Sequence, residues 1–375
     1  MARTYLDYNA STPIDPAAAM AMRAFLVDHF GNPSSGHWAA AGARAALDEA
    51  RGQVAALLGA ETDEIIFTSR GSEANNLALK GVAWALRARG THIVTSAVEH
   101  PAILGPCRFL ERQGFEVSIV PVDHFGRVDP DDVARAITPQ TVLVSVMHAN
   151  NEVGTIQPIG RIGRIARAHG ALLHTDAAQT VGKISTDVNA LGVDLLTVAG
   201  HKLYAPKGVG ALYVRRGTPI EPLIHGAGHE GGRRAGTESA LLAVGLGAAC
   251  RLASDLAPME RVRTLRERLW RRLQADFGDR VVLNGHPHQR LPNTLNVSFP
   301  GQAGADVLAR LDGVAASTGS ACHAGRIELS PVLKAMGVAP ETGMGAIRFS
   351  LGRGTTAEEI DAVVDRLACI LARAA

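Results

Sequence analysis

The sequence predicts an α/β protein with a large domain built on a mainly parallel β-sheet and a second, smaller α+β domain. Short apolar runs alternate with longer helix-like segments through most of the first 250 residues, which is typical of strands joined by crossover helices. At 375 residues the chain is too long for one simple hydrophobic core. Hydrophobic residues make up 46% of the chain and charged residues 20%, a composition typical of well-buried globular proteins.

The strands predicted for the large domain are short apolar runs that all precede residue 200. They lie at 64–68, 92–95, 117–120, 142–146, 171–174 and 194–198. Helical patterns fill several of the intervals, as at 73–88 and 159–169. We expect helices on both faces of the resulting sheet and a ligand beyond the carboxyl ends of its strands.

The remainder of the chain predicts the small domain. The segment 257–277 is strongly amphipathic and charged, which predicts a long helix, and 293–299 alternates like a half-exposed strand. We therefore expect a large domain at 13–255 and a small domain formed by 1–12 together with 256–375. No repeat, low-complexity tract or evident linker marks the boundary near residue 255.

Charge and hydropathy argue against several classes of partner. The formal net charge is only +2, which does not suit a dedicated binder of nucleic acid or of acidic membranes. The apolar stretch 240–250 has eleven residues, two of them glycine, and is too short to span a membrane. Asp7 precedes any apolar run, so no signal peptide is expected. We expect a cytoplasmic protein.

The cysteines and lysines limit the chemistry that is available. The four cysteines contain no C-x-x-C pair, so neither a metal site of the structural zinc type nor a disulfide framework is indicated. Basic charge is carried mostly by arginine. The lysines are Lys80, Lys183, Lys202, Lys207 and Lys334. Chemistry that needs a free amine therefore has few candidates.

The first chemical motif pairs an acid with a lysine. One predicted strand ends in HTDAAQ at 174–179, and 26 residues after Asp176 another ends in GHK, with Lys202 last. These side chains can face one ligand from the ends of adjacent strands. Pyridoxal phosphate needs such a pair, a lysine for its aldehyde carbon and a carboxylate against its pyridine nitrogen. An arbitrary pair of this kind is more often a surface lysine and a loop acid, so further motifs must decide.

A second motif suits a phosphate group. The predicted strand at 64–68 leads into SRGS at 69–72, and a helix begins at about Glu73. Backbone N–H groups at a helix start, together with a small hydroxyl, bind phosphate dianions well. Ser72 could also simply cap the helix.

These motifs and others along nearly the whole chain resemble the class V aminotransferase-fold family, and within it the NifS/IscS-type cysteine desulfurases. The further matching stretches are YLDYNASTP at 5–13, FGNPS at 30–34, VEH at 98–100, MHANNE at 147–152, STGSAC at 317–322 and RFSLGR at 348–353. The resemblance implies the fold type I of pyridoxal-phosphate transferases, pyridoxal 5'-phosphate as the cofactor and a homodimer.

The resemblance also implies which residues contact the cofactor ring. Lys202 would bind the cofactor covalently, and Asp176 would contact the pyridine nitrogen. Gln179 would hydrogen-bond the ring hydroxyl. His100 would stack on the ring and help move protons, although taken alone it would more often be an ordinary buried histidine.

At the phosphate, the resemblance implies contacts from Gly71, Ser72 and His201, with Thr237 contributed by a second subunit. One position departs from the family, because Ala199 stands where IscS-like enzymes usually have serine. A hydrogen bond of about 1–2 kcal/mol to the phosphate is lost there. The remaining donors still predict cofactor binding, but the change gives more weight to relatives that resemble selenocysteine lyases.

For the substrate, the resemblance implies that Arg348 grips the carboxylate, where a planar guanidinium can make a bidentate contact. Asn32 would assist it. Asn151 would lie near the substrate carboxylate and the ring hydroxyl, and taken alone it would be a turn residue.

Cys322 decides which reaction the resemblance predicts. Cys107, Cys250 and Cys369 lie in helical, apolar-patterned surroundings and are interpreted as inert core residues. Cys322 lies among small residues suited to a mobile loop, where a thiol can reach a bound substrate and then an acceptor protein. A buried loop cysteine is the ordinary alternative. The spacing from Cys322 to the SPV at 330–332 matches the long-loop group of the family.

The predicted activity is conversion of L-cysteine to L-alanine, with the sulfur held as a Cys322 persulfide. A sulfur-acceptor protein would receive it for iron–sulfur cluster assembly or nucleic-acid thio-modification. Two alternatives remain, a selenocysteine lyase on the same scaffold and a partner-dependent sulfur-carrier scaffold. The GAGHEG at 226–231 fits a dinucleotide fingerprint but lacks a clear preceding strand and following helix, so a nicotinamide oxidoreductase is remote.

Overall fold

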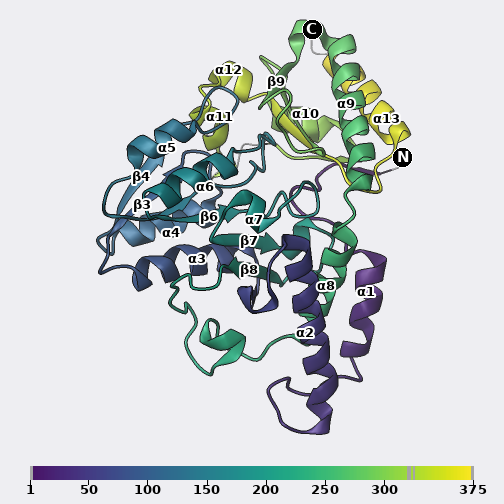
Figure 1. Cartoon of the computed structure of the whole chain (residues 1–375). Helices are drawn as coiled ribbons and strands as arrows, with labels where there is room; N and C mark the ends of the chain where they lie inside the picture. The colour runs from purple at the N-terminus through teal and green to yellow at the C-terminus, as the bar shows by residue number, and fades with distance from the viewer. Residues whose placement is uncertain (1–2, 319–321, 324–325, 373–375) are drawn as a thin grey trace.

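The computed structural model describes residues 3–318, 322–323 and 326–372, and at 322–323 and 326–327 it describes the main chain alone. A seven-stranded sheet forms the centre of the molecule (Figure 1), in the order β2-β8-β7-β6-β5-β3-β4. Neighbouring strands from β7 to β4 are parallel, whereas β8 is antiparallel to both β2 and β7. The strands are β2 (Ile65–Thr68), β3 (His92–Ser96), β4 (Glu116–Val120), β5 (Thr141–Ser145), β6 (Leu172–Asp176), β7 (Leu195–Ala199) and β8 (Gly210–Val214). The prediction of a mainly parallel sheet is confirmed.

Helices cover both faces of this sheet, because alternate strand residues point to opposite sides. Ile66 packs with α3 and α4 in one buried cluster, whereas its neighbours Ile65 and Phe67 pack with α2, α6 and α8 in another. These helices are α2 (Trp38–Leu58), α3 (Gly71–Ala85), α4 (Pro101–Glu111), α6 (Ile159–Ala168) and α8 (Ala240–Ala253). The cluster with Ile66 consists mainly of side chains from segments predicted as strands and helices, whereas the other draws many residues from α2 and α8, which were not predicted as helices.

A second, three-stranded antiparallel sheet has the order β14-β10-β9 and its own buried core. Its strands are β9 (Val282–Asn284), β10 (Thr294–Ser298) and β14 (Ala346–Ser350), and its main helices are α9 (Ala257–Phe277) and α13 (Ala357–Ala372). The N-terminal β1 (Thr4–Tyr5) pairs with β11 (Val314–Ala315), and Leu6 joins this core. The N-terminal Leu6 therefore packs with α9 and with the C-terminal helix α13 (Figure 1). The domain boundaries at residues 12 and 255 remain a proposal.

The remaining elements are short. The helices are α1 (Pro16–Met22), α5 (Pro130–Ala136), α7 (Val188–Leu191), α10 (Gly304–Arg310), α11 (Pro331–Ala335) and α12 (Pro340–Gly343), and the strands are β12 (Cys322–His323) and β13 (Arg326–Ile327). Turns of 3₁₀-helix are η1 (Arg23–Phe25), η2 (Thr62–Glu64), η3 (Gly200–Lys202), η4 (His229–Gly232) and η5 (Gly278–Arg280).

Strand β10 corrects one expectation from the sequence. The alternation at 293–299 predicted a half-exposed strand, but all five residues of β10 are buried. The polar side chains of β10 are not in contact with solvent because they form hydrogen bonds with other segments of the chain. Thr294 Oγ1 accepts a hydrogen bond from Asn9 Nδ2 at 2.9 Å, and Asn296 Nδ2 donates to the carbonyl of Glu152 at 3.2 Å.

The cysteines require a second correction. Cys107 and Cys250 are buried free thiols, as expected. Cys369 is exposed rather than buried, because it lies on the outer side of α13, whose inward side is formed by residues such as Val364 and Leu367.

Within the part of the chain that the structure describes, no single helix has the length and apolar composition to cross a membrane. The pair Ala240–Ala253 and Ala257–Arg280 meets those criteria only when the two helices are combined, and it is bent by 73°.

Candidate active site

A cavity of about 360 Å³ lies where several strands of the large sheet end. Asp176 is the last residue of β6, Ala199 is the last of β7, and the connection after β2 leads to Gly71. A site beyond the carboxyl ends of the strands was predicted, and these residues confirm its position. The cavity is lined by nine residues named from the sequence: Gly71, Ser72, His100, Asn151, Asp176, Gln179, His201, Lys202 and Arg348.

The carboxylate of Asp176 is held from both of its oxygens. Asn75 Nδ2, on α3, donates to Oδ2 at 2.7 Å, and the backbone N–H of Ala178 donates to Oδ1 at 2.9 Å. Asp176 is buried, so these bonds fix the direction in which its negative charge faces the cavity. The sequence analysis did not identify Asn75, although it lies in the helix that follows the phosphate motif.

Lys202 lies opposite, at the end of η3. Its Nζ donates to the carbonyl oxygens of Asn9 at 2.6 Å and Ala10 at 2.8 Å. Burial, and then the charge of Arg348, lower the pKa of Lys202 to about 8, while Asp176 acts in the opposite direction. A lysine with this pKa has a large neutral fraction near pH 8, which is the form that attacks a carbonyl carbon.

The N-terminus of α3 forms another side of the cavity. The helix begins at Gly71, and its N-cap residue Arg70 makes no side-chain capping bond. Ser72 is therefore inside the first turn and is not the cap. N–H groups of that turn, which a helix leaves without internal partners, are available to an anion. A Cβ on Gly71 would lie 3.0 Å from the Cβ of Ala199, so the backbone approaches closely here.

Two histidines border the cavity as neutral rings. Burial, with the charges of Lys202 and Lys207, lowers the pKa of His201 to about 4. His100 is the N-cap of α4, and its Nδ1 accepts from the backbone N–H of Ala102 at 3.0 Å. This contact leaves the ring proton on Nε2. Burial lowers the pKa of His100 as well, against the charge of Asp176.

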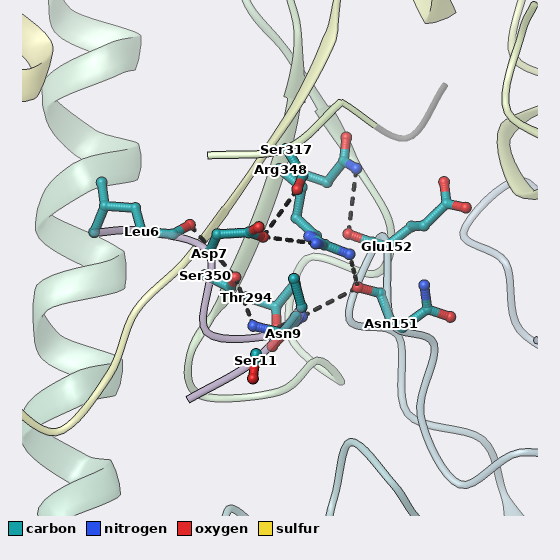
Figure 2. Close-up of polar contacts among 12 residues, drawn as sticks. Leu6, Asp7, Asn9, Ser11, Asn151, Glu152, Thr294, Ser317, Arg348 and Ser350 are labelled. Atoms are coloured by element: carbon teal, nitrogen blue, oxygen red, sulfur yellow. Dashed lines mark hydrogen bonds and ion pairs between the residues drawn. The ribbon is translucent and has the colours of Figure 1, made fainter. Parts of the chain in front are cut away.

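Arg348 belongs to a polar network that includes the start of the segment bearing Cys322 (Figure 2). Its Nη2 donates to Asp7 Oδ1 at 2.8 Å, and its Nη1 donates to the carbonyl of Asn151 at 3.0 Å. The same Asp7 oxygen accepts from Ser317 Oγ at 2.9 Å. Ser317 and Arg348 also exchange two backbone hydrogen bonds, at 3.2 and 2.7 Å. Arg348, Asp7 and Ser317 thus form one hydrogen-bonded unit.

Asn9 is a central residue that the sequence analysis did not identify. It is 1% exposed, and its carbonyl accepts from both Lys202 Nζ and Gln179 Nε2. Its Nδ2 donates to the carbonyl of Asn151 at 3.1 Å (Figure 2). The only signal in the sequence was its place inside the matching stretch at 5–13.

Two of the predicted residues, Asn32 and Thr237, do not line this cavity, and the side chain of a third is not described. Asn32 is exposed, and its Oδ1 accepts from the N–H of Ser34 at 2.9 Å. Thr237 lines a different cavity, of about 220 Å³, near the start of α8; its predicted place was the site of a second copy. The side chain of Cys322 lies outside the described residues, although its backbone pairs with Ile327. Their roles remain predictions.

The described residues fit pyridoxal phosphate in chemistry and in size. The cavity lining offers helix N–H groups for a dianion, a fixed carboxylate for a ring nitrogen and an amine of lowered pKa. A volume of about 360 Å³ lies in the range of small-molecule sites.

Known proteins resemble this chain over nearly its whole length. A model of the family described as aminotransferase class-V matches residues 4–363. A cysteine desulfurase IscS from Dictyoglomus turgidum is 49% identical over 371 residues, which cover 98% of this chain and 94% of the relative. A solved NifS-like protein superposes with a TM-score of 0.93 at 38% identity, over 99% of this chain and 100% of the other. A solved structure of SspA in complex with cysteine gives a TM-score of 0.84 at 37% identity, over 94% and 100% of the two chains.

Proposed function

We propose, since this chain belongs to the aminotransferase class-V family, that it is a pyridoxal-phosphate-dependent cysteine desulfurase, which converts L-cysteine to L-alanine and retains the sulfur as a persulfide. One observation carries the proposal. Lys202, with its pKa lowered to about 8, shares one cavity with the fixed carboxylate of Asp176 and the uncapped start of α3. The relatives named cysteine desulfurase IscS support the choice of substrate.

When bound, pyridoxal phosphate supplies an electron sink that makes the substrate's α-proton acidic and its carbon–sulfur bond breakable. The protein's residues hold that group and move the protons. Asp176 would keep a positive charge on the ring nitrogen, and the first turn of α3 would bind the phosphate. Lys202 would hold the aldehyde carbon, and its neutral amine would take the substrate's α-proton at Nζ.

Arg348 orients the substrate through its carboxylate. Two of its five N–H donors are used by Asp7 and by the carbonyl of Asn151, and an arginine presents the others in a fixed plane. The contacts with Asp7 and Asn151 therefore set the plane of the guanidinium before substrate arrives. This preorganisation directs the α-proton toward Lys202.

We assign the sulfur transfer to Cys322. Its thiolate attacks the substrate sulfur, an S–S bond forms and the carbon–sulfur bond breaks, and the electron pair stays on the carbon that becomes the methyl group of alanine. Ser317, five residues before Cys322, is tied to Asp7 and Arg348. The segment that bears the thiol therefore begins beside the residue that binds the substrate.

The partners of the chain form the next part of the proposal. Large apolar side chains are exposed at one end of the chain, around α1 and the start of α2: Met20 67%, Leu26 68%, Val27 76%, Phe30 79% and Trp38 86%. Such a patch is more typical of an interface than of a free surface, which supports a homodimer in which Thr237 completes the partner's phosphate site.

A sulfur-acceptor protein would take the persulfide. The free thiols of Cys107 and Cys250 suit a reducing compartment such as the cytoplasm.

The function is tested by measuring alanine released from L-cysteine by the purified protein with pyridoxal phosphate and a thiol reductant. The wild type should release alanine and sulfide in equal amounts. Lys202→Ala should release neither, and Cys322→Ser should bind the cofactor but lose alanine formation by orders of magnitude, because serine is a far weaker nucleophile toward sulfur. Near-normal alanine formation by Cys322→Ser would refute the persulfide route.

Ala199 favours a second candidate, a selenocysteine lyase, because the usual serine is missing from the phosphate site. The same assay with L-selenocysteine separates the two functions. A lyase would turn over selenocysteine much faster than cysteine, and it would retain that turnover in Cys322→Ser.

A further inference from the structure

Lys183 is a second buried lysine beside the cavity, and the proposed reaction gives it no role. It is only 8% exposed. Its Nζ donates to Gln179 Oε1 at 3.0 Å and lies 3.5 Å from Asn9 Oδ1. Burial, with the charges of Lys202 and Arg348, lowers the pKa of Lys183 to about 7. A lysine buried at this cost without a catalytic contact calls for an explanation.

Lys183 Nζ contacts two residues that line the cavity, Gln179 and Asn9, and the Asn9 side-chain oxygen also accepts from Asn293 Nδ2 at 2.9 Å. Below its pKa of about 7, Lys183 is an ammonium that can only donate, so the oxygen end of the Gln179 amide must face it. A backbone carbonyl can only accept a hydrogen bond, and the Asn9 carbonyl accepts one from Gln179 Nε2 at 3.0 Å. Turning the amide around would bring donor against donor and acceptor against acceptor. Lys183 and Asn9 therefore specify one orientation of the amide.

That orientation has a consequence for any ligand in the cavity. An amide nitrogen carries two N–H groups, and the bond to Asn9 uses one of them. The second N–H is left to donate into the cavity that Gln179 lines. A donor at this place favours a ligand oxygen that carries negative charge.

We propose that Lys183 is a positioning residue, which holds the Gln179 amide so that its nitrogen donates to the ring oxygen of bound pyridoxal phosphate. The inference rests on the proposed function, since it names the cofactor. Without Lys183, the Gln179 oxygen loses its partner, and the amide can turn and set that oxygen against the ring oxygen. Two acceptors would then face each other. Lys183 acts on the cofactor only through Gln179.

The test is a double-mutant cycle on cofactor affinity. Apo-protein of the wild type, Lys183→Met, Gln179→Leu and the double variant is titrated with pyridoxal phosphate, and Lys334→Met serves as the matched control because Lys334 is exposed on α11. Each single variant should bind about tenfold more weakly, as expected for one lost hydrogen bond to a charged oxygen. The double variant should bind no more weakly than Gln179→Leu, and the control should match the wild type.

Two further measurements separate positioning from a general packing role. The pH midpoint of the bound cofactor's visible absorbance should shift in the same direction and by a similar amount in Lys183→Met and Gln179→Leu, with no shift in Lys334→Met. Lys183→Gln, whose amide can still donate to Gln179, should bind more tightly than Lys183→Met. Thermal unfolding of each apo-protein checks that it is folded, and Lys183→Leu replaces Lys183→Met in the cycle if the latter is not.

Wild-type affinity in Lys183→Met, or a loss that adds in full to that of Gln179→Leu, overturns the inference. These outcomes leave the proposed function intact if the wild type binds the cofactor and releases alanine from cysteine. A wild type that does not bind pyridoxal phosphate overturns both.

Discussion

The amine of Lys202 should react as a nucleophile at a pH where ordinary lysines are almost fully protonated. Its pKa is lowered from 10.5 to about 8. At pH 8 about half of the Lys202 amines are then neutral, compared with about 0.3% for a lysine at the ordinary value. The neutral fraction differs by about 150-fold, since each pKa unit contributes a factor of ten. This advantage requires no cofactor and is present in the apo-protein.

The pH is varied first, and then the charged side chains that shift the pKa of Lys202 are removed one at a time. Burial is the main cause of the lowered pKa, the charge of Arg348 lowers it further, and the carboxylates of Asp176 and Asp7 raise it. Arg348→Leu should therefore move the titration midpoint above that of the wild type, and Asp176→Asn should move it below.

The assay is trace acetylation of the apo-protein between about pH 6 and pH 10, with modified peptides quantified by mass spectrometry. Exposed Lys334 serves as the internal standard. The ratio of Lys202 to Lys334 labelling should be highest near and below pH 8 and should fall above pH 8, where the neutral fraction of Lys202 approaches its maximum. Labelling of Lys202 that rises in parallel with Lys334 up to pH 10 would refute the role given to burial. If borohydride reduction attaches pyridoxal phosphate to Lys183 or Lys207, that residue and not Lys202 is the lysine that binds the cofactor.

Three other expectations concern the phosphate site, the stability and the assembly. Ala199→Ser should tighten pyridoxal-phosphate binding about tenfold, because a hydroxyl there restores one bond to a charged acceptor; an unchanged dissociation constant in apo-protein titrations would count against this placement. Burial raises the pKa of Glu152 from 4.5 to about 6, against the hydrogen bond from Ser330, so its contribution to stability is complete below about pH 4.5 and is lost as the pH rises through 6. As the pH rises from about 4.5 to above 6, the free energy of unfolding of Glu152→Gln, measured in urea, should increase by about 2 kcal/mol relative to that of the wild type. A difference between the two proteins that does not depend on pH would contradict the role given to burial. If Thr237 completes the site of a second copy, ultracentrifugation should find a dimer, and a fully active monomer at nanomolar concentration would exclude the shared site.

The sequence predicted those parts of the fold that have a local pattern. The periodicity at 257–277 has the same bounds as α9, and the apolar runs correspond to β2 through β7. Strand β8 is as long as β7 but was not predicted, and it enters the sheet antiparallel between β2 and β7, which are distant in the sequence. Nothing near Gly210–Val214 in the sequence specifies those neighbours.

The residues of the site likewise fall into those that a local motif predicted and those that it did not. Residues such as Asp176 and Lys202 lie at strand ends inside recognisable motifs, so their meeting could be predicted. Asn9 and Lys183 were not assigned roles, because a buried polar residue has no periodic signal. Their roles depend on contacts with residues far away in the sequence. Asn9, for example, contacts Lys202, 193 residues later.

The most direct test of the account is to find the sulfur after one turnover. Wild-type protein loaded with pyridoxal phosphate is given L-cysteine without reductant, digested and analysed by peptide mass. The account predicts one added sulfur atom on the peptide that contains Cys322, in an amount equal to the alanine formed, and none on peptides with Cys107, Cys250 or Cys369. Alanine formation with an unmodified Cys322 peptide, or with the sulfur on another cysteine, would contradict it.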